Sequence, residues 1–280
     1  MKLLRYGPVG EELPGMVDAQ GDIRALSPVI REFDADVLSP DGLRILAALD
    51  VEKLPKVEGS PRIGAPLPRF HEVIGIGLNY RDHALEANLP IPTEPIVFDV
   101  ASASVCGPND PILVPPGSTH TDWEVELGIV IGSRVSRVDE QAALAAIAGY
   151  CGVNDVSERD WQMNRGGQWG KGKSFDNFTP VGPWIATADE IPDVSNLELR
   201  LSVNGEPRQH GNTRDMIFSP GYLVSYLSQF MTLHPGTLII TGTPAGVGLG
   251  MKPPQYLKPG DTVEQRITGL GSQRHEVVAG

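Results

Sequence analysis

Residues 121–131 of the chain read TDWEVELGIVI, a run that is apolar and β-branched apart from its acidic residues. This composition predicts a β-strand, in which residues two apart share a face. Glu124 and Glu126 should therefore point the same way from an otherwise apolar element. Two carboxylates at that separation repel each other unless water or a cation lies between them.

A third carboxylate follows in the apolar stretch 152–156, which reads GVNDV and contains Asp155. Three carboxylates with no neighbouring His or Cys suit a hard, oxygen-binding ion such as Mg²⁺ or Mn²⁺. The alternative is a half-exposed strand with two solvated glutamates, which is the commoner explanation of an isolated Glu-x-Glu. Asp155 and the motifs described below favour the metal site.

The amino-acid composition limits the kinds of molecule that the protein is expected to bind. The 280 residues include 23 Lys and Arg against 35 Asp and Glu, a net charge of −12. This charge argues against nucleic acid or an anionic membrane as partner, although a bound metal could still attract an anionic small substrate. The 32 Gly and 25 Pro favour a turn-rich protein with many strands.

Nothing in the sequence indicates export or membrane insertion. The N-terminus MKLLRYGP lacks the apolar stretch of a signal peptide, and no apolar run approaches membrane-spanning length. Cys106 and Cys151 are the only cysteines, too few for a disulfide framework and without zinc spacing. We expect a soluble cytosolic protein that acts on a small molecule.

The chain divides near residue 70. Residues 1–69 should form a small N-terminal domain with strands, a helical run at 43–49 and a proline-rich linker at 52–70. Residues 70–280 should form a second, larger domain, which the resemblance described below implies to be the catalytic one. It opens with a strand at 73–77 and a helix at 79–86, and the further elements are strands at 96–98, 112–114 and 123–132 and a helix at 141–150.

Turn and cap signals place the later elements. Asn204-Gly205 predicts a type I′ hairpin, and Ser219-Pro220 should cap a helix that runs to about Met231. Residues 237–241 should form a buried strand. Strands and helices do not alternate regularly, so the fold class is α+β and mainly β.

Glycine-rich stretches at 75–80 (GIGLNY) and 246–250 (GVGLG) do not support a dinucleotide site. The first has Tyr80 where the third glycine belongs, and the second has the wrong spacing. These glycines indicate places where the backbone approaches a ligand or another strand closely.

Three further motifs could take part in chemistry. His83 and Glu86 are three apart on the predicted helix, so a carboxylate could orient an imidazole that acts as a general base. Lys173, in the stretch 168–176 (QWGKGKSFD), could bind a substrate carboxylate or a developing oxyanion. The turn 241–248 (TGTPAGVG) could grip a carboxylate with its N–H groups and hydroxyls. Each motif also has an explanation without chemistry. His83 and Glu86 could be a surface pair, Lys173 a solvated loop lysine, and residues 241–248 a tight turn at a strand end.

Together these segments resemble the fumarylacetoacetate hydrolase family over about residues 70 to 275. The resemblance rests on five motifs in order, at 77–83 (GLNYRDH), 122–128 (DWEVELG), 154–160 (NDVSERD), 171–176 (KGKSFD) and 241–248 (TGTPAGVG).

The resemblance implies a mixed β-sandwich roll with a small N-terminal α/β domain, and a homodimer or higher homo-oligomer. It implies one Mg²⁺ or Mn²⁺ per chain on Glu124, Glu126 and Asp155. The family keeps a water-activating dyad on a lid where this chain has His83 and Glu86, and its substrate-binding positions fall on three further residues, Gln162, Lys173 and Thr243.

The N-terminus and residues 223–233 resemble a narrower branch, often labelled ureidoglycolate lyase, whose members look like 2,4-diketo-3-deoxy-L-fuconate or L-rhamnonate hydrolases. One departure is Val100, where many relatives carry a lysine near the substrate. We expect Val100 to leave the distal pocket less cationic, so that a neutral hydroxylated tail is preferred to a second carboxylate.

The activity that this resemblance implies is hydrolysis of the C3–C4 bond of a 2,4-dioxo acid to pyruvate and a small hydroxy acid such as lactate. The alternatives are an oxaloacetate decarboxylase or other acylpyruvase, a sugar-acid hydratase or dehydratase, and a metal- or sugar-acid-binding protein with weak catalysis. Turnover with added Mg²⁺ separates enzyme from binder, and product analysis separates hydrolase from decarboxylase.

Overall fold

Strand β10 (Val125–Ile131) forms inside a large mixed sheet, as its sequence predicts. The computed structural model describes all 280 residues. In spatial order the sheet contains β3 (Ile23–Ala25), β2 (Leu13–Val17), β1 (Lys2–Tyr6), β13 (Thr179–Thr187), β11 (Ile147–Asn154), β10, β16 (Leu238–Ile240), β5 (Val73–Gly77) and β6 (Ile96–Val100), with β4 (Ile63–Gly64) beside β1 and β7 (Val105–Cys106) beside β13.

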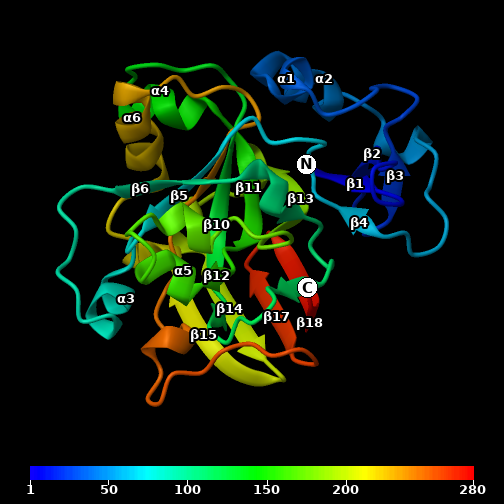
Figure 1. The fold of residues 1–280 in the computed structure, drawn as a ribbon. Coiled ribbons are helices and arrows are strands. Elements are labelled where there is room, and N and C mark those ends of the chain that lie inside the picture. Colours follow the sequence, from blue (N-terminus) through cyan, green and yellow to red (C-terminus); the bar gives the residue numbers. More distant parts are fainter.

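A second sheet packs below the first in Figure 1. Its strands are, in order, β15 (Glu206–Asn212), β14 (Glu198–Val203), β17 (Thr262–Ile267), β18 (Gly271–Ala279) and β8 (Ile112–Val114), and a separate pair is formed by β9 (Thr121–Asp122) and β12 (Ser157–Glu158). The helices are α1 (Ala35–Leu38), α2 (Pro40–Ala47), α3 (Arg81–Glu86), α4 (Glu140–Ala145), α5 (Arg159–Met163) and α6 (Pro220–Phe230). This mainly β architecture confirms the predicted α+β class.

Strand β10 divides its residues between two cores. Val125, Leu127 and Ile129 belong to the larger apolar cluster, which also includes residues of β14, β17 and β18. Val130 belongs to a second cluster that includes side chains from the N-terminal 50 residues. Glu124 and Glu126 alternate with the first set, so the period-two geometry of the strand places both carboxylates away from the core between the sheets.

The N-terminal segment lies on one flank of the molecule, with α4 and α6 at a far corner (Figure 1). Its first strand pairs with β13, through Lys2 with Ala186 and Leu3 with Ile185, so the N-terminal strands extend the large sheet. Leu3 and Leu38 belong to the same apolar cluster as Val153 of β11. None of the helices is both long and apolar enough to cross a membrane.

Most predicted elements form, with one clear exception. Asn204 and Gly205 both have positive φ, as a type I′ turn requires, and Ser219 caps α6 by accepting from the N–H of Tyr222. The helix predicted at 141–150 is wrong in its second half, because α4 ends at Ala145. Residues from Ile147 onward pair with β10 and β13, where eight consecutive residues are buried. Sheet pairing there overrides the helical preference of alanine.

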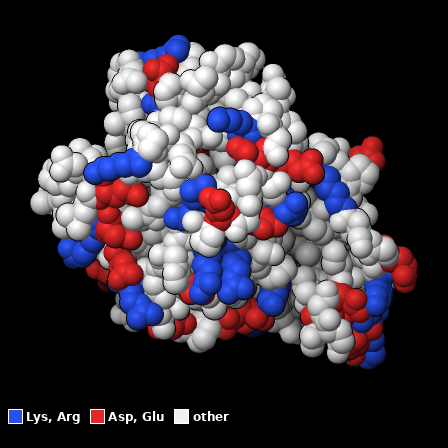
Figure 2. Space-filling model, turned by 90° about the horizontal axis from the view of Figure 1, so that it is seen from below, with Lys and Arg blue, Asp and Glu red and all other residues white.

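Charged side chains of both signs mix on the face seen from below (Figure 2). On the second sheet, Arg200 pairs with Glu198 at 2.7 Å and Arg266 lies 3.8 Å from the same glutamate. Arg274 pairs with Glu264 on the neighbouring strand. Each of these three arginines therefore has an acidic partner, and two of them share Glu198.

Candidate metal and catalytic site

The structure brings the three predicted carboxylates together. Ligand oxygens of Glu124, Glu126 and Asp155 lie within 4.8 Å of one another, and all three side chains are buried. Glu126 lies in β10 and Glu124 just before it, while Asp155 directly follows β11. The N–H of Asp155 donates to the carbonyl of Glu124 at 2.9 Å, which ties the ends of the two strands together.

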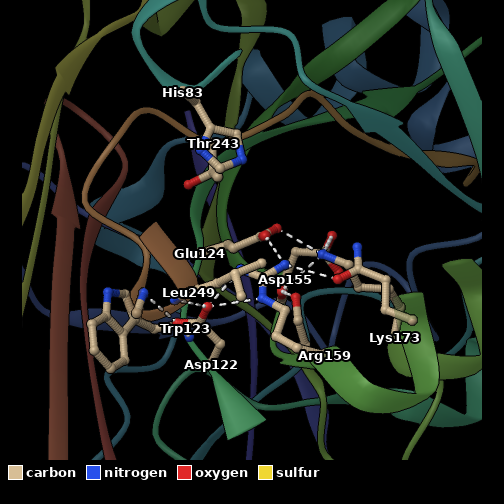
Figure 3. Close-up of polar contacts among 12 residues, drawn as sticks. His83, Asp122, Trp123, Glu124, Asp155, Arg159, Lys173, Thr243 and Leu249 are labelled. Atoms are coloured by element: carbon tan, nitrogen blue, oxygen red, sulfur yellow. Dashed lines mark hydrogen bonds and ion pairs between the residues drawn. The ribbon is translucent and has the colours of Figure 1, made fainter. Parts of the chain in front are cut away.

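Two buried cations face these carboxylates (Figure 3). Lys173 Nζ lies 2.6 Å from Glu124 Oε2 and 2.6 Å from Asp155 Oδ2. Arg159 Nη1 lies 2.8 Å from Glu124 Oε1, and Arg159 Nη2 lies 2.8 Å from Asp122 Oδ2. Four buried carboxylates against two buried cations leave two uncompensated negative charges, which one divalent cation would neutralise.

The pKa shifts express the same imbalance. Burial and the charges of Asp155 and Glu124 raise the pKa of Glu126 well above its usual value. Burial also raises the pKa of Asp155, to about 6, although Lys173 opposes this shift. Burial alone would raise the pKa of Glu124, but the charges of Lys173 and Arg159 outweigh it and lower this pKa to about 2. Glu126 and Asp155 thus have too little positive charge near them to offset their burial.

The donor set fits a hard divalent cation. Asp155 Oδ1 is buried and has no hydrogen-bond partner, although a buried carboxylate oxygen normally has one. All three candidate ligands are carboxylates, the type that Mg²⁺ and Mn²⁺ prefer. Glu124, Glu126 and Asp155 would therefore hold such an ion.

Helix α3 supplies the predicted dyad. His83 Nδ1 lies 3.0 Å from Glu86 Oε2, and Glu86 Oε1 accepts from the N–H of Gly246 at 2.9 Å. Asp82 of the same helix accepts from the N–H of Ala245 at 3.3 Å. Two carboxylates of α3 therefore fasten it to the loop after β16, which fixes the direction of the imidazole.

The loop after β16 also holds the carboxylate cluster in place. The N–H of Gly242 donates to Glu126 Oε2. Gly242 has φ +95°, and a Cβ there would lie 2.7 Å from the Cβ of Asn79, so a side chain would be strained and would clash. The hydroxyl of Thr243 donates to the carbonyl of Val125 at 2.9 Å, which leaves its backbone N–H as the donor available to a ligand.

Three residues that the sequence analysis did not single out support the site. Asp122 accepts from Arg159 and from the N–H groups of Gly248 and Leu249. Gln209 of β15 accepts from the N–H of Val125 at 2.9 Å and donates to Thr243 Oγ1 at 2.7 Å. Asp122 and Arg159 lie within quoted motifs and could have been found as a charge pair. No local signal marks Gln209, because its partners come from distant segments.

A cavity of about 570 Å³, including the space at its mouth, connects these groups. Every predicted site residue except Glu86 lines it, and Glu86 reaches it through His83. Gln162 also lines the cavity, and its Oε1 accepts from Arg159 at 2.9 Å. Val100 does not line it, which corrects the prediction made for that position. Val100 is buried in the second apolar cluster, where it pairs with Val73.

Comparisons with known proteins identify the family of the chain. Residues 72–278 match a family model described as "Fumarylacetoacetate (FAA) hydrolase C-terminal". A Burkholderia multivorans protein that carries the provisional name of a hydrolase is 58% identical over 274 residues, which cover 98% of this chain and 97% of that protein.

Two solved structures cover the whole chain and are themselves fully covered. Fumarylacetoacetate hydrolase from the psychrophile Exiguobacterium antarcticum is 34% identical, with a TM-score of 0.87. Maleylpyruvate hydrolase from Sphingobium sp. SYK-6, solved in complex with manganese(II) and pyruvate, is 27% identical, with a TM-score of 0.83.

Proposed function

The chain belongs to the fumarylacetoacetate hydrolase family, and we propose that it is a divalent-cation-dependent hydrolase of 2,4-dioxo acids. The reaction splits the C3–C4 bond with water and releases pyruvate and a carboxylic acid. One observation carries the proposal: a buried cluster of three carboxylates, short of positive charge, shares a cavity with a carboxylate-oriented histidine.

A Mg²⁺ or Mn²⁺ ion on Glu124, Glu126 and Asp155 would supply Lewis acidity to the substrate oxygens. The manganese and pyruvate in the Sphingobium enzyme support both the ion and the product. Thr243 and Gln162 line the cavity, and the backbone N–H of Thr243 and the side-chain amide of Gln162 would orient the substrate carboxylate. Lys173 and Arg159 would stabilise negative charge that develops on oxygen.

His83 is the proposed general base. A carboxylate can only accept, so Nδ1 of His83 carries the proton donated to Glu86, and Nε2 has a free lone pair. Nε2 takes a proton from water, and the resulting hydroxide attacks C4. The C3–C4 electron pair then remains on the pyruvate fragment as its enolate, and the proton held by His83 passes to C3. Glu86 stabilises the imidazolium between these two steps.

The sequence analysis predicts a more specific substrate, a 2,4-diketo-3-deoxy sugar acid, which is one member of the class of 2,4-dioxo acids. It rests on the resemblance to the narrower branch, since the argument from Val100 does not apply to a residue outside the cavity. Oxaloacetate decarboxylation is the second candidate, because the same carboxylate cluster would serve it. That reaction needs no attacking water, so the dyad in the same cavity favours hydrolysis.

The test is pyruvate release from acetylpyruvate, measured after chelation and again after addition of Mg²⁺ or Mn²⁺. We expect activity only with the ion, and acetate as the second product. Glu126→Gln should keep the fold and abolish ion binding by calorimetry as well as turnover. Unchanged ion affinity in this variant would remove the ligand assignment. Turnover of oxaloacetate to CO₂ without cleavage of acetylpyruvate would favour the decarboxylase.

A further inference from the structure

The lining of the cavity combines a charged group with apolar side chains. The charged group consists of Glu124, Glu126, Asp155, Arg159 and Lys173, and Lys173 Nζ lies 5.7 Å from the centroid of the Phe98 ring, so the apolar lining begins beside this group. Eight of the eighteen lining residues are apolar, namely Ile76, Leu78, Ala87, Leu89, Phe98, Met163, Trp169 and Leu249. The part of a substrate that extends beyond the charged side chains therefore meets mainly carbon.

The rings of Phe98 and Trp169 form an aromatic wall of the cavity. They pack against glycines of strand β5. Phe98 of β6 pairs directly with Gly75 of β5, and a Cβ at Gly75 would lie 2.2 Å from the Phe98 ring. A Cβ at Gly77 would lie 2.3 Å from the ring of Trp169. Glycine at both positions lets the rings lie against the backbone of β5. The two ring centroids are 5.8 Å apart, so the wall is continuous.

The cavity offers no spare cation for a second carboxylate. Lys173 is shared by Glu124 and Asp155, and Arg159 is shared by Glu124 and Asp122. Lys171 does not line the cavity, and its ammonium donates to the carbonyl of Arg165 at 2.7 Å. A charged tail would lose its hydration without gaining a partner.

Hydroxyl groups on the substrate tail would also find few hydrogen-bond partners in the cavity. The uncharged side chains in the lining that carry a polar atom are those of Gln162, Thr243 and Trp169, together with the imidazole of His83. The hydroxyl proton of Thr243 is used by Val125, and Oε1 of Gln162 is used by Arg159. A tail with several hydroxyls would leave most of them unpaired against the aromatic wall.

The mouth of the cavity is apolar as well. Leu89, Met163 and Leu249 line the cavity, and each is at least 40% exposed. Covering these side chains with a hydrocarbon chain removes apolar surface from water on both partners, which is favourable.

We propose that the preferred substrates are 2,4-dioxo acids with an apolar tail beyond C4, alkyl or aryl, and that Phe98 and Trp169 select for it. This inference rests on the proposed function and names the substrate class within it. It also opposes the sugar-acid prediction, because that tail carries hydroxyls.

The first experiment compares kcat/KM of the Mg²⁺- or Mn²⁺-loaded enzyme across five types of 2,4-dioxo acid or related acid. They are acetylpyruvate, its longer alkyl homologues, benzoylpyruvate, the dicarboxylates fumarylpyruvate and oxaloacetate, and a 2,4-diketo-3-deoxy sugar acid. We expect kcat/KM to rise about 3- to 4-fold for each of the first added methylenes. The sugar acid and the dicarboxylates should fall at least about 10-fold below an alkyl substrate of equal length.

The outcomes separate the two proposals. Cleavage of acetylpyruvate with no gain from longer alkyl chains, or with the sugar acid or a dicarboxylate preferred, would overturn the apolar-tail inference alone. Failure to cleave any of the 2,4-dioxo acids would overturn the proposed function itself.

Variants locate the selectivity. Trp169→Ala should lower the ratio of kcat/KM for the hexanoyl over the acetyl substrate towards one. Leu89→Ser, at an exposed position that cannot disturb the core, should lower the same ratio by about 3-fold or more. Trp161→Ala is the matched control, since this half-exposed tryptophan packs edge-on against Phe175 and does not line the cavity. If the ratio of kcat/KM for the hexanoyl over the acetyl substrate is the same in Leu89→Ser and in Trp161→Ala, the assignment of the apolar lining as the selective surface is contradicted.

Discussion

His83 is held by two successive contacts, its own bond to Glu86 and the bond from Gly246 to Glu86. We expect His83→Ala to lower kcat for a 2,4-dioxo acid by about 10²- to 10⁴-fold, because a general base contributes a factor of that order. The variant should still bind Mn²⁺ and pyruvate, which calorimetry would measure. Near-normal turnover in this variant would assign water activation to another group.

Asp155 gives the metal-free protein a characteristic dependence on pH. Its pKa is raised from 3.8 to about 6, chiefly by burial, so between these values the folded state holds a proton that the unfolded state has lost. The stability from this proton is complete below the unfolded pKa and is lost as pH rises through about 6. We therefore expect Asp155→Asn to gain stability relative to wild type as pH rises over this range.

Urea unfolding in the presence of a chelator, from about pH 5 to about pH 7.5, measures this difference. Added Mg²⁺ or Mn²⁺ should restore stability to wild type at the higher pH and leave the Asp155→Asn protein unchanged, because only the first retains all three carboxylates. Parallel stability curves for the two proteins with chelator would contradict the raised pKa.

Among the elements, β15 connects the second sheet to the site through one side chain. Gln209 accepts from the N–H of Val125, which lies between Glu124 and Glu126. Its amide also donates to Thr243 Oγ1 and to the carbonyl of Pro244 in the loop after β16. We expect Gln209→Leu to cost roughly 2–6 kcal/mol, because it orphans the Val125 N–H and the Pro244 carbonyl. It should also raise KM and lower kcat by about 10-fold or more, since the loop and β10 lose their common support.

Gln273 is the matched control for Gln209. It is also a buried glutamine of the second sheet, but it donates to the carbonyls of Gly152 and Gly182, away from the cavity. Gln273→Leu should lower the urea midpoint by a similar amount and leave KM unchanged. Equal kinetic effects in the two variants would make the role of Gln209 purely structural.

For the whole molecule, an ion network joins the N-terminal segment to the rest. Arg62 binds Asp110 through Nε at 2.8 Å and through Nη2 at 2.5 Å, and binds Glu12 through Nη1 at 2.8 Å. Glu12 and Asp110 are largely buried, so Arg62→Ala leaves two carboxylates poorly compensated. We expect a loss of about 1–4 kcal/mol in the free energy of unfolding.

The control for Arg62 is Lys53→Ala, which breaks the exposed pair of Lys53 with Asp50. This change should leave the urea midpoint where it is, because exposed pairs contribute little. If Arg62→Ala behaves like the control, the network does not hold the two parts together. The homodimer implied by the family stays a prediction, which sedimentation would test.

The sequence alone determined the elements whose causes are local. Alternation along residues 121–131 placed Glu124 and Glu126 on one face, Asn204-Gly205 fixed a hairpin, and Ser219 fixed the start of α6. Five ordered motifs were enough to identify the family, because each combines residue types that chemistry constrains.

Only the tertiary structure decided what depends on contacts between distant segments. Residues 147–150 form a strand because β10 and β13 flank them, although their composition favours a helix. Val100 lies in a core, and Gln209 reaches the site from 84 residues beyond Val125. The apolar wall likewise depends on Phe98 and Trp169 meeting over the glycines of β5. Burial and long-range hydrogen bonds are properties of the packed chain, so no local pattern encodes them.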